Sequence, residues 1–208
     1  MSDNLPLRQT VVFLSAFIYW AGVLIQARRV RKQIGRSPNL KPRGTKEKLL
    51  WLGWFLVIMA WLIQPLLISR LRSWPGLELA SRLLNPFTLV LGLILILGGY
   101  ACTLWCYRVM GNAWRIGINP KEKNFLVTGG PYSSVRHPIY LFQIVMLGGV
   151  VLLLPTFCSL AVLGVHLVCV AIKASDEELY LRSVHGKPYE DYLAQTGRLI
   201  PRLTRNRH

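Results

Sequence analysis

The chain has 208 residues, of which 52% are hydrophobic, and it carries a formal net charge of +16. A soluble domain of this length could not bury so many apolar side chains, so the composition excludes an ordinary soluble enzyme and indicates an integral membrane protein. The charge does not point to nucleic acid, because the cations lie in segments between apolar runs, where anionic lipid headgroups are the natural partners. We therefore expect a membrane partner and no nucleic acid.

Five apolar runs predict an all-α integral membrane fold with about five transmembrane helices. The first run lacks a basic head and a small-residue cleavage site, so we expect a retained helix rather than a signal peptide. The last two runs are short and are separated by Pro155, which predicts a C-terminal helical hairpin. The runs cover Thr10–Gln26, Leu49–Ser69, Pro86–Tyr107, Ile139–Leu154 and Thr156–Ile172.

The chain divides at the end of the third run. Residues 1–107 are expected to hold the first three transmembrane helices and a basic loop, and residues 108–208 to hold the polar clusters and the hairpin. After Pro155 the next proline is Pro188. Because proline is the main breaker of helices, the fifth helix is expected to continue past the membrane surface near Lys173.

The basic residues are distributed asymmetrically. Segments 28–48, 108–138 and 173–208 all lie on one side of the predicted bundle and hold 21 of the 25 basic residues. The other side carries Arg8, Arg70, Arg72 and Arg82. By the positive-inside rule, the N-terminus is expected outside and the C-terminus in the cytoplasm. The loop before the fourth helix and the extension of the fifth would then meet on the cytosolic face.

The four cysteines do not suggest a metal site. All of them lie within apolar runs, without Cys-x-x-Cys pairs and without a histidine at ligand spacing. We therefore expect structural thiols and no metal. The cysteines are Cys102, Cys106, Cys158 and Cys169.

The first polar cluster runs from Gly129 to Tyr140 and combines turn formers, a cation, an imidazole and two phenols. Its Gly-Gly-Pro-Tyr start predicts a turn in which the backbone can approach a ligand closely. Pro138 is expected in the first turn of the fourth helix, whose free N–H groups favour an anion such as a carboxylate. Arg136 either clamps a carboxylate or phosphate or anchors the loop at the membrane surface.

The second polar cluster begins with Asp176, Glu177 and Glu178. Acidic residues on a strongly basic surface would suit a cationic or hydroxyl-rich ligand, although a solvated helix face, with a pair between Lys173 and Glu177, is the alternative. Deeper in the predicted spans, polar residues are either functional or hydrogen-bonded between helices. These deeper residues are Gln143 and His166.

The two clusters together resemble the isoprenylcysteine carboxyl methyltransferase family of membrane methyltransferases. The shared spacing is Gly-x-Tyr-x-x-x-Arg-His-Pro-x-Tyr, followed by Glu-Glu-x-x-Leu-x-x-x-(aromatic)-Gly-x-x-Tyr-x-x-Tyr. The resemblance covers residues 108–201 and includes a Trp-Arg-Ile-Gly segment at 114–117 that is typical of prokaryotic members. The matching positions are Gly130, Tyr132, Arg136, His137, Pro138, Tyr140, Glu177, Glu178, Leu181, His185, Gly186, Tyr189 and Tyr192.

The resemblance implies S-adenosyl-L-methionine as methyl donor, bound in a cytosolic pocket between the loop before the fourth helix and the extension of the fifth. Arg136, Lys173 and Glu178 are the expected catalytic residues. Lys173 stands where eukaryotic members carry an arginine, and His185 replaces the usual Phe or Tyr. The expected cofactor-binding residues are Gly117, Asn124, Phe125, Leu126, Val127, Tyr132, His137, Pro138, Ile139, Tyr140, Glu177, His185 and Tyr189.

The leading interpretation is carboxyl methylation of a lipid or of a prenylated small molecule or protein. Arg136 or Lys173 would position its polar head, and a carboxylate acceptor needs no general base. A phospholipid amine N-methyltransferase is the nearest alternative, and an amine acceptor would recruit a base such as His185 or Glu178. A sterol reductase with a nicotinamide cofactor would have more helices. A non-enzymatic protein that binds anionic lipid is the remaining alternative, and the oligomeric state is left open.

Overall fold

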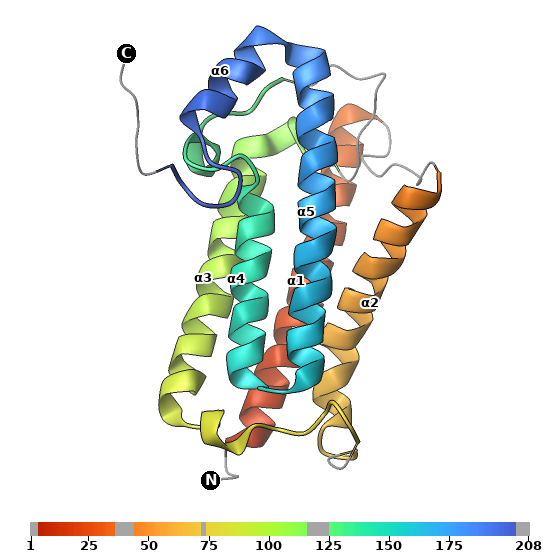
Figure 1. Ribbon diagram of the computed structural model, residues 1–208, viewed down its shortest axis with the longest axis vertical. Helices are drawn as coiled ribbons and strands as arrows, with labels where there is room; N and C mark the ends of the chain where they lie inside the picture. The colour runs from red at the N-terminus through yellow and green to blue at the C-terminus, as the bar shows by residue number, and fades with distance from the viewer. Residues whose placement is uncertain (1–3, 36–43, 72–73, 116–124, 203–208) are drawn as a thin grey trace.

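The computed structural model describes residues 4–35, 44–71, 74–115 and 125–202, and these form an all-α bundle (Figure 1). Five long helices run up and down the bundle, and a short sixth helix lies across the end where the chain terminates. Three 3-10 turns connect them: η1 (Ser81–Leu83), η2 (Gly111–Ala113) and η3 (Gly130–Ser133). The helices are α1 (Leu5–Ile34), α2 (Thr45–Leu67), α3 (Pro86–Met110), α4 (Pro138–Leu153), α5 (Phe157–His185) and α6 (Lys187–Gln195).

The expected all-α membrane architecture is confirmed. By length and composition, α1, α2, α5 and the helix that includes α3 could each cross a membrane, and α4 is a shorter apolar helix. The predicted hairpin of α4 and α5 turns at Leu154 and Pro155, and Thr156 caps α5 by accepting a hydrogen bond from the Ser159 N–H. Two features differ from the prediction: α1 continues to Ile34, where Gly35 ends it at a φ of 71°, and α6 was not expected.

The packing of α4 on α3 depends on small residues. A Cβ atom added to Gly99 would lie 2.6 Å from Met146 Cγ and 2.9 Å from the Phe142 carbonyl oxygen. A Cβ on Gly149 would lie 2.8 Å from the Gly92 carbonyl oxygen. Small residues at such positions let two helix backbones approach closely, which is a common way to join helices in membranes. The position of α4, and of the polar loop before it, is therefore set by α3.

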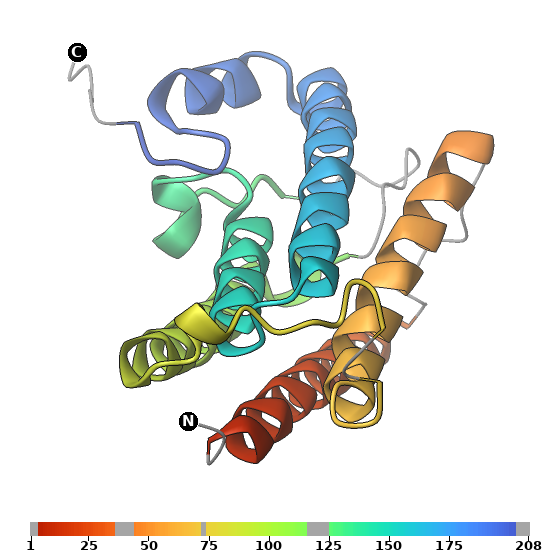
Figure 2. The same cartoon turned by 60° about the horizontal axis from the view of Figure 1, so that its bottom comes forward.

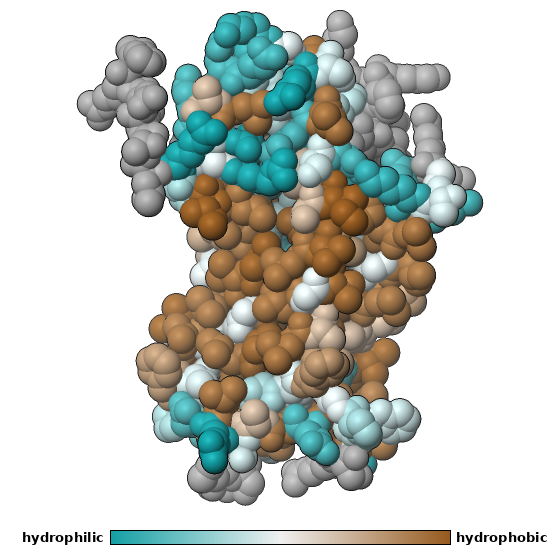
Figure 3. All heavy atoms as spheres, in the orientation of Figure 1, coloured by the Kyte–Doolittle hydropathy of each residue, from teal (hydrophilic) through white to brown (hydrophobic). Residues whose placement is uncertain are grey.

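α5 lies between α2 and α4, as the view tilted to bring the lower end of the bundle forward shows (Figure 2). The sides of the bundle are apolar between two polar ends (Figure 3), and large side chains such as Phe17 and Leu97 face outward. An exposed apolar band is the surface that lipid would cover. The larger polar end carries α6 and the extension of α5.

Arg8 is buried and connects three helices at the end of the bundle opposite α6. From the sequence it is only one of the four cations expected on the less basic side. Its guanidinium donates to the carbonyl oxygens of Asn85, Leu152 and Leu153 at 2.6, 3.2 and 3.3 Å, respectively. Thr88 Oγ1 accepts a further bond at 3.3 Å. A cation is favoured at the carbonyl end of a helix such as α4. Arg8 therefore joins α1 to the start of α3 and the end of α4.

Candidate active site

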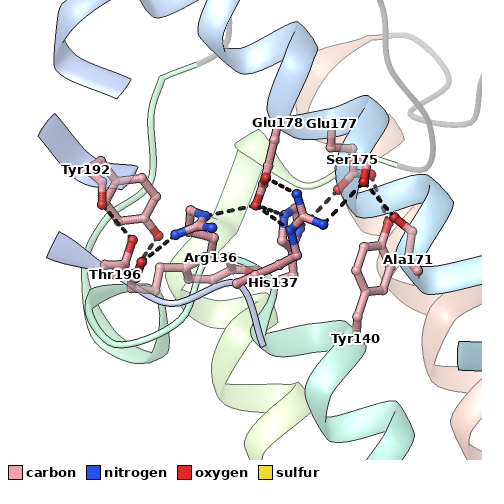
Figure 4. A network of polar contacts seen from close by, with 11 residues as sticks. Arg136, His137, Tyr140, Ala171, Ser175, Glu177, Glu178, Tyr192 and Thr196 are labelled. Atoms are coloured by element: carbon pink, nitrogen blue, oxygen red, sulfur yellow. Dashed lines mark hydrogen bonds and ion pairs between the residues drawn. The ribbon is translucent and has the colours of Figure 1, made fainter. Parts of the chain in front are cut away.

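The two polar clusters meet at the larger polar end of the bundle (Figure 4). As predicted, α5 continues without a break past Lys173 and carries Glu177 and Glu178 beyond the apolar band. Arg136, in the loop before α4, donates from Nε to Glu178 Oε1 at 2.9 Å, and both side chains are largely buried. This ion pair connects the two clusters.

The expected turn forms as η3, in which Gly130 has a φ of 58°. A Cβ atom on Gly130 would lie 2.8 Å from Val109 Cγ2, so the glycine lets this turn pack closely on α3. The turn buries Tyr132, whose carbonyl oxygen accepts a hydrogen bond of 2.6 Å from the Tyr192 hydroxyl of α6. In this way α6 holds the loop in place.

His137 caps the start of α4, and Pro138 follows in the first turn as predicted. The imidazole is buried between two carboxylates: Nδ1 lies 3.4 Å from Glu177 Oε2, and Nε2 lies 3.4 Å from Glu178 Oε1. Burial alone would lower the pKa of His137, but the two carboxylates raise it above its ordinary value. Nε2 is buried without a well-aligned hydrogen-bond partner in the part of the chain that the structure describes. The site therefore favours a protonated His137.

Tyr140 lies in the first turn of α4 and holds Glu177 from the other side. Its hydroxyl donates to Glu177 Oε1 at 2.8 Å. Its ring stacks on His137 with 5.6 Å between centroids and on Trp54 of α2 with 6.3 Å. Glu177 keeps 25% of its side chain exposed, so this carboxylate is oriented and still accessible.

Residues 196–198, which we call the C-terminal strap, complete the site and were not predicted. The backbone N–H groups of Arg136 and His137 donate to the strap carbonyls of Gly197 and Arg198 at 2.9 and 3.1 Å. The Arg136 side chain also donates to the Thr196 carbonyl. The strap therefore pairs along the loop that leads into α4.

Arg198 of the strap binds Glu178, the second of the two glutamates. Its Nε donates to Glu178 Oε1 at 3.1 Å and its Nη2 to Glu178 Oε2 at 2.5 Å, while Nη1 donates to Ser175 Oγ at 3.3 Å. Arg136 and Arg198 thus share one carboxylate. The sequence signal for this return of the chain is the pair Tyr189 and Tyr192. Both are buried on α6 just before the strap.

Several expected site residues lie farther from this network. Lys173 is half-buried one turn before Glu177, but in the described part of the chain it makes no ion pair, and Glu177 faces His137 and Tyr140 instead. His185 ends α5 and is half-buried. Tyr189 is fully buried, and its hydroxyl has no hydrogen-bond partner among the described residues.

The segment before the turn is only partly described. Phe125 is 91% exposed, whereas Leu126 and Val127 are half-buried, as is Ile139 in α4. The expected cofactor residues Gly117 and Asn124 lie outside the described residues.

The chemistry of the site suits a ligand that is both cationic and polar. Glu177 offers an accessible carboxylate, and aromatic rings beside it can contact a cation. The buried Tyr189 hydroxyl and His137 Nε2 have no well-aligned hydrogen-bond partner within the described residues. Buried polar atoms are almost always hydrogen-bonded in native proteins, so both are candidates to contact a ligand.

Comparison with known proteins agrees with this chemistry. Residues 87–188, a little under half of the chain, match the family model of phospholipid methyltransferases. The match includes α3, both polar clusters and all of α4 and α5, and it ends before the strap.

Two curated relatives are similar over a longer stretch. One is the cobalt-zinc-cadmium resistance protein CzcN of Cupriavidus metallidurans, 26% identical over 154 residues, which are 74% of this chain and 64% of that protein. Another is the nickel-cobalt-cadmium resistance protein NccN of Alcaligenes xylosoxydans xylosoxydans, 25% identical over 151 residues, which are 73% of this chain and 64% of that protein. The chain thus spans less than two thirds of the length of these relatives. The region that builds the site is similar to the membrane methyltransferases of the phospholipid methyltransferase family.

Proposed function

We propose that this protein transfers a methyl group from S-adenosyl-L-methionine to a lipidic acceptor at the membrane surface that carries α6. The observation that carries the proposal is the meeting of Glu177 and Glu178 with Arg136, His137 and Tyr140. All five residues lie in the segment that matches the phospholipid methyltransferase model. Residues 108–208 would form the catalytic region, with α1 and α2 as membrane support.

The residues present fit adenosylmethionine, which supplies an activated methyl group when bound. Glu177 would bind the ribose hydroxyls or the amine, and the rings of Tyr132 and Tyr140 would contact the adenine or the sulfonium. The first turn of α4, with Pro138 and Ile139, would face the carboxylate. The Tyr189 hydroxyl offers a further partner. Leu126 and Val127 would contribute apolar contacts, together with Phe125, Gly117 and Asn124.

We assign different roles to the three expected catalytic residues. Glu178 is bound by Arg136 and Arg198, and a carboxylate held by two guanidinium groups is a weak base. We therefore assign Glu178 and Arg136 to positioning the loop and α4. Lys173 makes no ion pair among the described residues, so we assign it to the acceptor's polar head. The rate of methyl transfer would then depend mainly on alignment of the acceptor with the methyl group and on exclusion of water.

The leading acceptor is the carboxylate of a prenylated molecule, as in isoprenylcysteine carboxyl methyltransferases. A carboxylate attacks without losing a proton, which agrees with a site whose carboxylate and imidazole are already paired with each other. Lys173 would hold it as a point charge rather than as a planar fork.

A phospholipid amine is the second candidate, and the matching family model carries the description of phospholipid methyltransferases. An amine must lose a proton before attack, and a protonated His137 could not accept it. His185, at the end of α5 and half-buried, is then the candidate base.

We infer that the protein is multi-pass, with the site on the cytosolic face and the N-terminus outside. The support is the sequence count, in which segments 28–48, 108–138 and 173–208 hold 21 of the 25 basic residues. A green fluorescent protein fused to the C-terminus should fluoresce in cells, whereas alkaline phosphatase at the same place should be inactive. The reverse pair of results would overturn this orientation.

Calorimetry on the purified full chain tests the function directly. We expect adenosylmethionine binding that is lost in Glu177→Gln and kept in the control Glu190→Gln, an exposed residue of α6. Lipid extract incubated with radiolabelled donor should then yield a labelled carboxyl ester or a labelled methylamine, which separates the two acceptors. Binding to anionic vesicles without any adenosylmethionine binding would instead favour the non-enzymatic interpretation.

A further inference from the structure

Helix α6 and the strap belong to one continuous segment, residues 186–202, that lies against the candidate active site (Figure 4). Within this segment Tyr189, Tyr192, Thr196 and Gly197 are buried, and most of the other residues are exposed. Parts of a protein with few buried apolar contacts open at a lower free-energy cost than the core does. We therefore expect this segment to open while the helical bundle stays folded.

A single residue, Gly186, joins α5 to α6. Helix α5 ends at His185, and α6 begins at Lys187. Gly186 has a φ of 56° and a ψ of −129°, a conformation that residues with a side chain rarely adopt. Hinges are a few residues at the ends of elements that absorb changes in backbone angles. Gly186 is thus placed to be the hinge of the segment.

Polar contacts hold the segment against the site. The Tyr192 hydroxyl donates to the Tyr132 carbonyl oxygen at 2.6 Å. The backbone N–H groups of Arg136 and His137 donate to carbonyl oxygens of the strap, and the Arg198 guanidinium binds a site carboxylate. All of these contacts join the segment to the site or to the loop before α4, so they break together when the segment swings away.

Two buried polar atoms give such an opening a purpose. The Tyr189 hydroxyl of α6 and Nε2 of His137, whose backbone pairs with the strap, have no well-aligned hydrogen-bond partner within the described residues. Tyr189 is 0% exposed and His137 is 6% exposed. A ligand that reaches these atoms has to displace part of the surrounding chain. α6 and the strap adjoin both atoms and are held mainly by polar contacts.

We propose that residues 186–202 form a cover that swings at Gly186, opens to admit adenosylmethionine and closes over it. In the closed form, α6 and the strap exclude water from the reacting atoms. The proposal rests on the proposed function for the identity of the ligand. The opening itself is a property of the ligand-free chain.

Hydrogen–deuterium exchange of the purified full chain, read by mass spectrometry, tests the opening without ligand. We expect residues 187–198 to exchange at least about tenfold faster than residues 175–184 on the extension of α5. The amides of Arg136 and His137 should exchange equally fast, because they donate to the strap. Fraying of the chain end alone would leave these two amides protected, and that result would overturn the proposal.

Adenosylmethionine should slow the exchange of the cover by about tenfold, because a ligand that binds the closed form stabilises it. The same change should appear at the Arg136 and His137 amides. Donor binding that leaves the exchange of both segments unchanged would contradict a cover that closes over the ligand.

Gly197→Ala is the variant that disturbs the closed form. A Cβ atom on Gly197 would overlap the Ile200 carbonyl oxygen, so the strap has to shift. The donor should dissociate about tenfold faster, with little change in melting temperature. Gly164→Ala is the matched control, because it adds the same methyl group to α5 at a position with no described atom within 4 Å. An unchanged dissociation rate in Gly197→Ala would count against the cover.

Gly186→Ala, strained at the hinge by the positive φ, is a second variant and should act in the same direction. A large loss of melting temperature in both Gly197→Ala and Gly186→Ala would show that the segment belongs to the folded core, and would overturn the proposal.

The exchange data separate the two hypotheses. If the wild type does not bind adenosylmethionine, the proposed function fails, while fast exchange of residues 187–198 in the ligand-free chain still supports the opening. If the donor binds but these residues exchange no faster than residues 175–184, the proposed function stands and the cover fails.

Discussion

Arg198 binds both carboxylate oxygens of Glu178, at 3.1 Å through Nε and 2.5 Å through Nη2, although the two residues belong to different elements. Glu178 also accepts a bond from Arg136 at 2.9 Å. One carboxylate of α5 therefore joins the loop before α4 to the C-terminal strap. Glu177 directly precedes Glu178 on α5. The contacts that fix Glu178 therefore also fix the orientation of the more accessible Glu177 carboxylate.

Arg198→Ala should weaken adenosylmethionine binding by about three- to tenfold, because Glu178 loses one of its two guanidinium partners and the strap loses its side-chain contact. The effect is moderate because Arg198 is 43% exposed and water screens the pair. Arg198→Lys should recover only part of the affinity, since an ammonium cannot bind two oxygens in a plane. Calorimetry measures both, with Arg202→Ala as control. Unchanged affinity in Arg198→Ala would show that the Arg198 side chain does not support the site.

Tyr140→Phe should reduce adenosylmethionine affinity by about tenfold, because it removes the hydroxyl that orients Glu177 and leaves that carboxylate with one fewer charge-assisted bond. The ring and its contacts with His137 and Trp54 remain, so the melting temperature should change little. The control is Tyr100→Phe on α3. A large loss of thermal stability, rather than of affinity, would assign Tyr140 a structural role only.

His137 should make stability depend on pH. Its pKa is raised in the folded chain by Glu177 and Glu178, which outweigh burial, so the folded state binds the proton more tightly than the unfolded state. The resulting stabilisation is complete below the unfolded value of about 6.5 and is lost as the pH rises through the folded value. Thermal unfolding in detergent between about pH 5.5 and 8.5 measures it. His137→Gln should flatten the curve, and parallel curves for the two proteins would contradict this account.

Arg8→Leu should destabilise the fold by about 3 kcal/mol, because it removes the guanidinium that donates to the carbonyls of Asn85, Leu152 and Leu153 and joins three helices. The free energy of unfolding, measured with denaturant in mixed micelles, is the readout. Arg82→Leu is the matched control, since Arg82 is an exposed arginine at the same end of the bundle. Equal stability of the two variants would mean that the Arg8 contacts contribute nothing in lipid.

The helices could be predicted because their signals are local. The length of an apolar run and the positions of Pro138 and Pro155 set where α4 and α5 begin and end. The absence of proline between Pro155 and Pro188 predicted that α5 would carry Glu177 past the apolar band. The end of α1 was missed because residues 27–34 are polar enough to leave the membrane. Hydropathy follows the lipid boundary, whereas the helix continues to Gly35.

The sequence by itself determined that this is an all-α membrane chain with two polar clusters whose spacing resembles that of membrane methyltransferases, since composition, periodicity and motif spacing are properties of short segments. Only the tertiary structure decided how those clusters meet. The close packing of α3 against α4 at Gly99 positions His137, and the return of the chain after α6 brings Arg198 onto Glu178. Contacts between residues so far apart depend on the packing of whole helices, so motif spacing indicated that the clusters belong together but not which atoms meet.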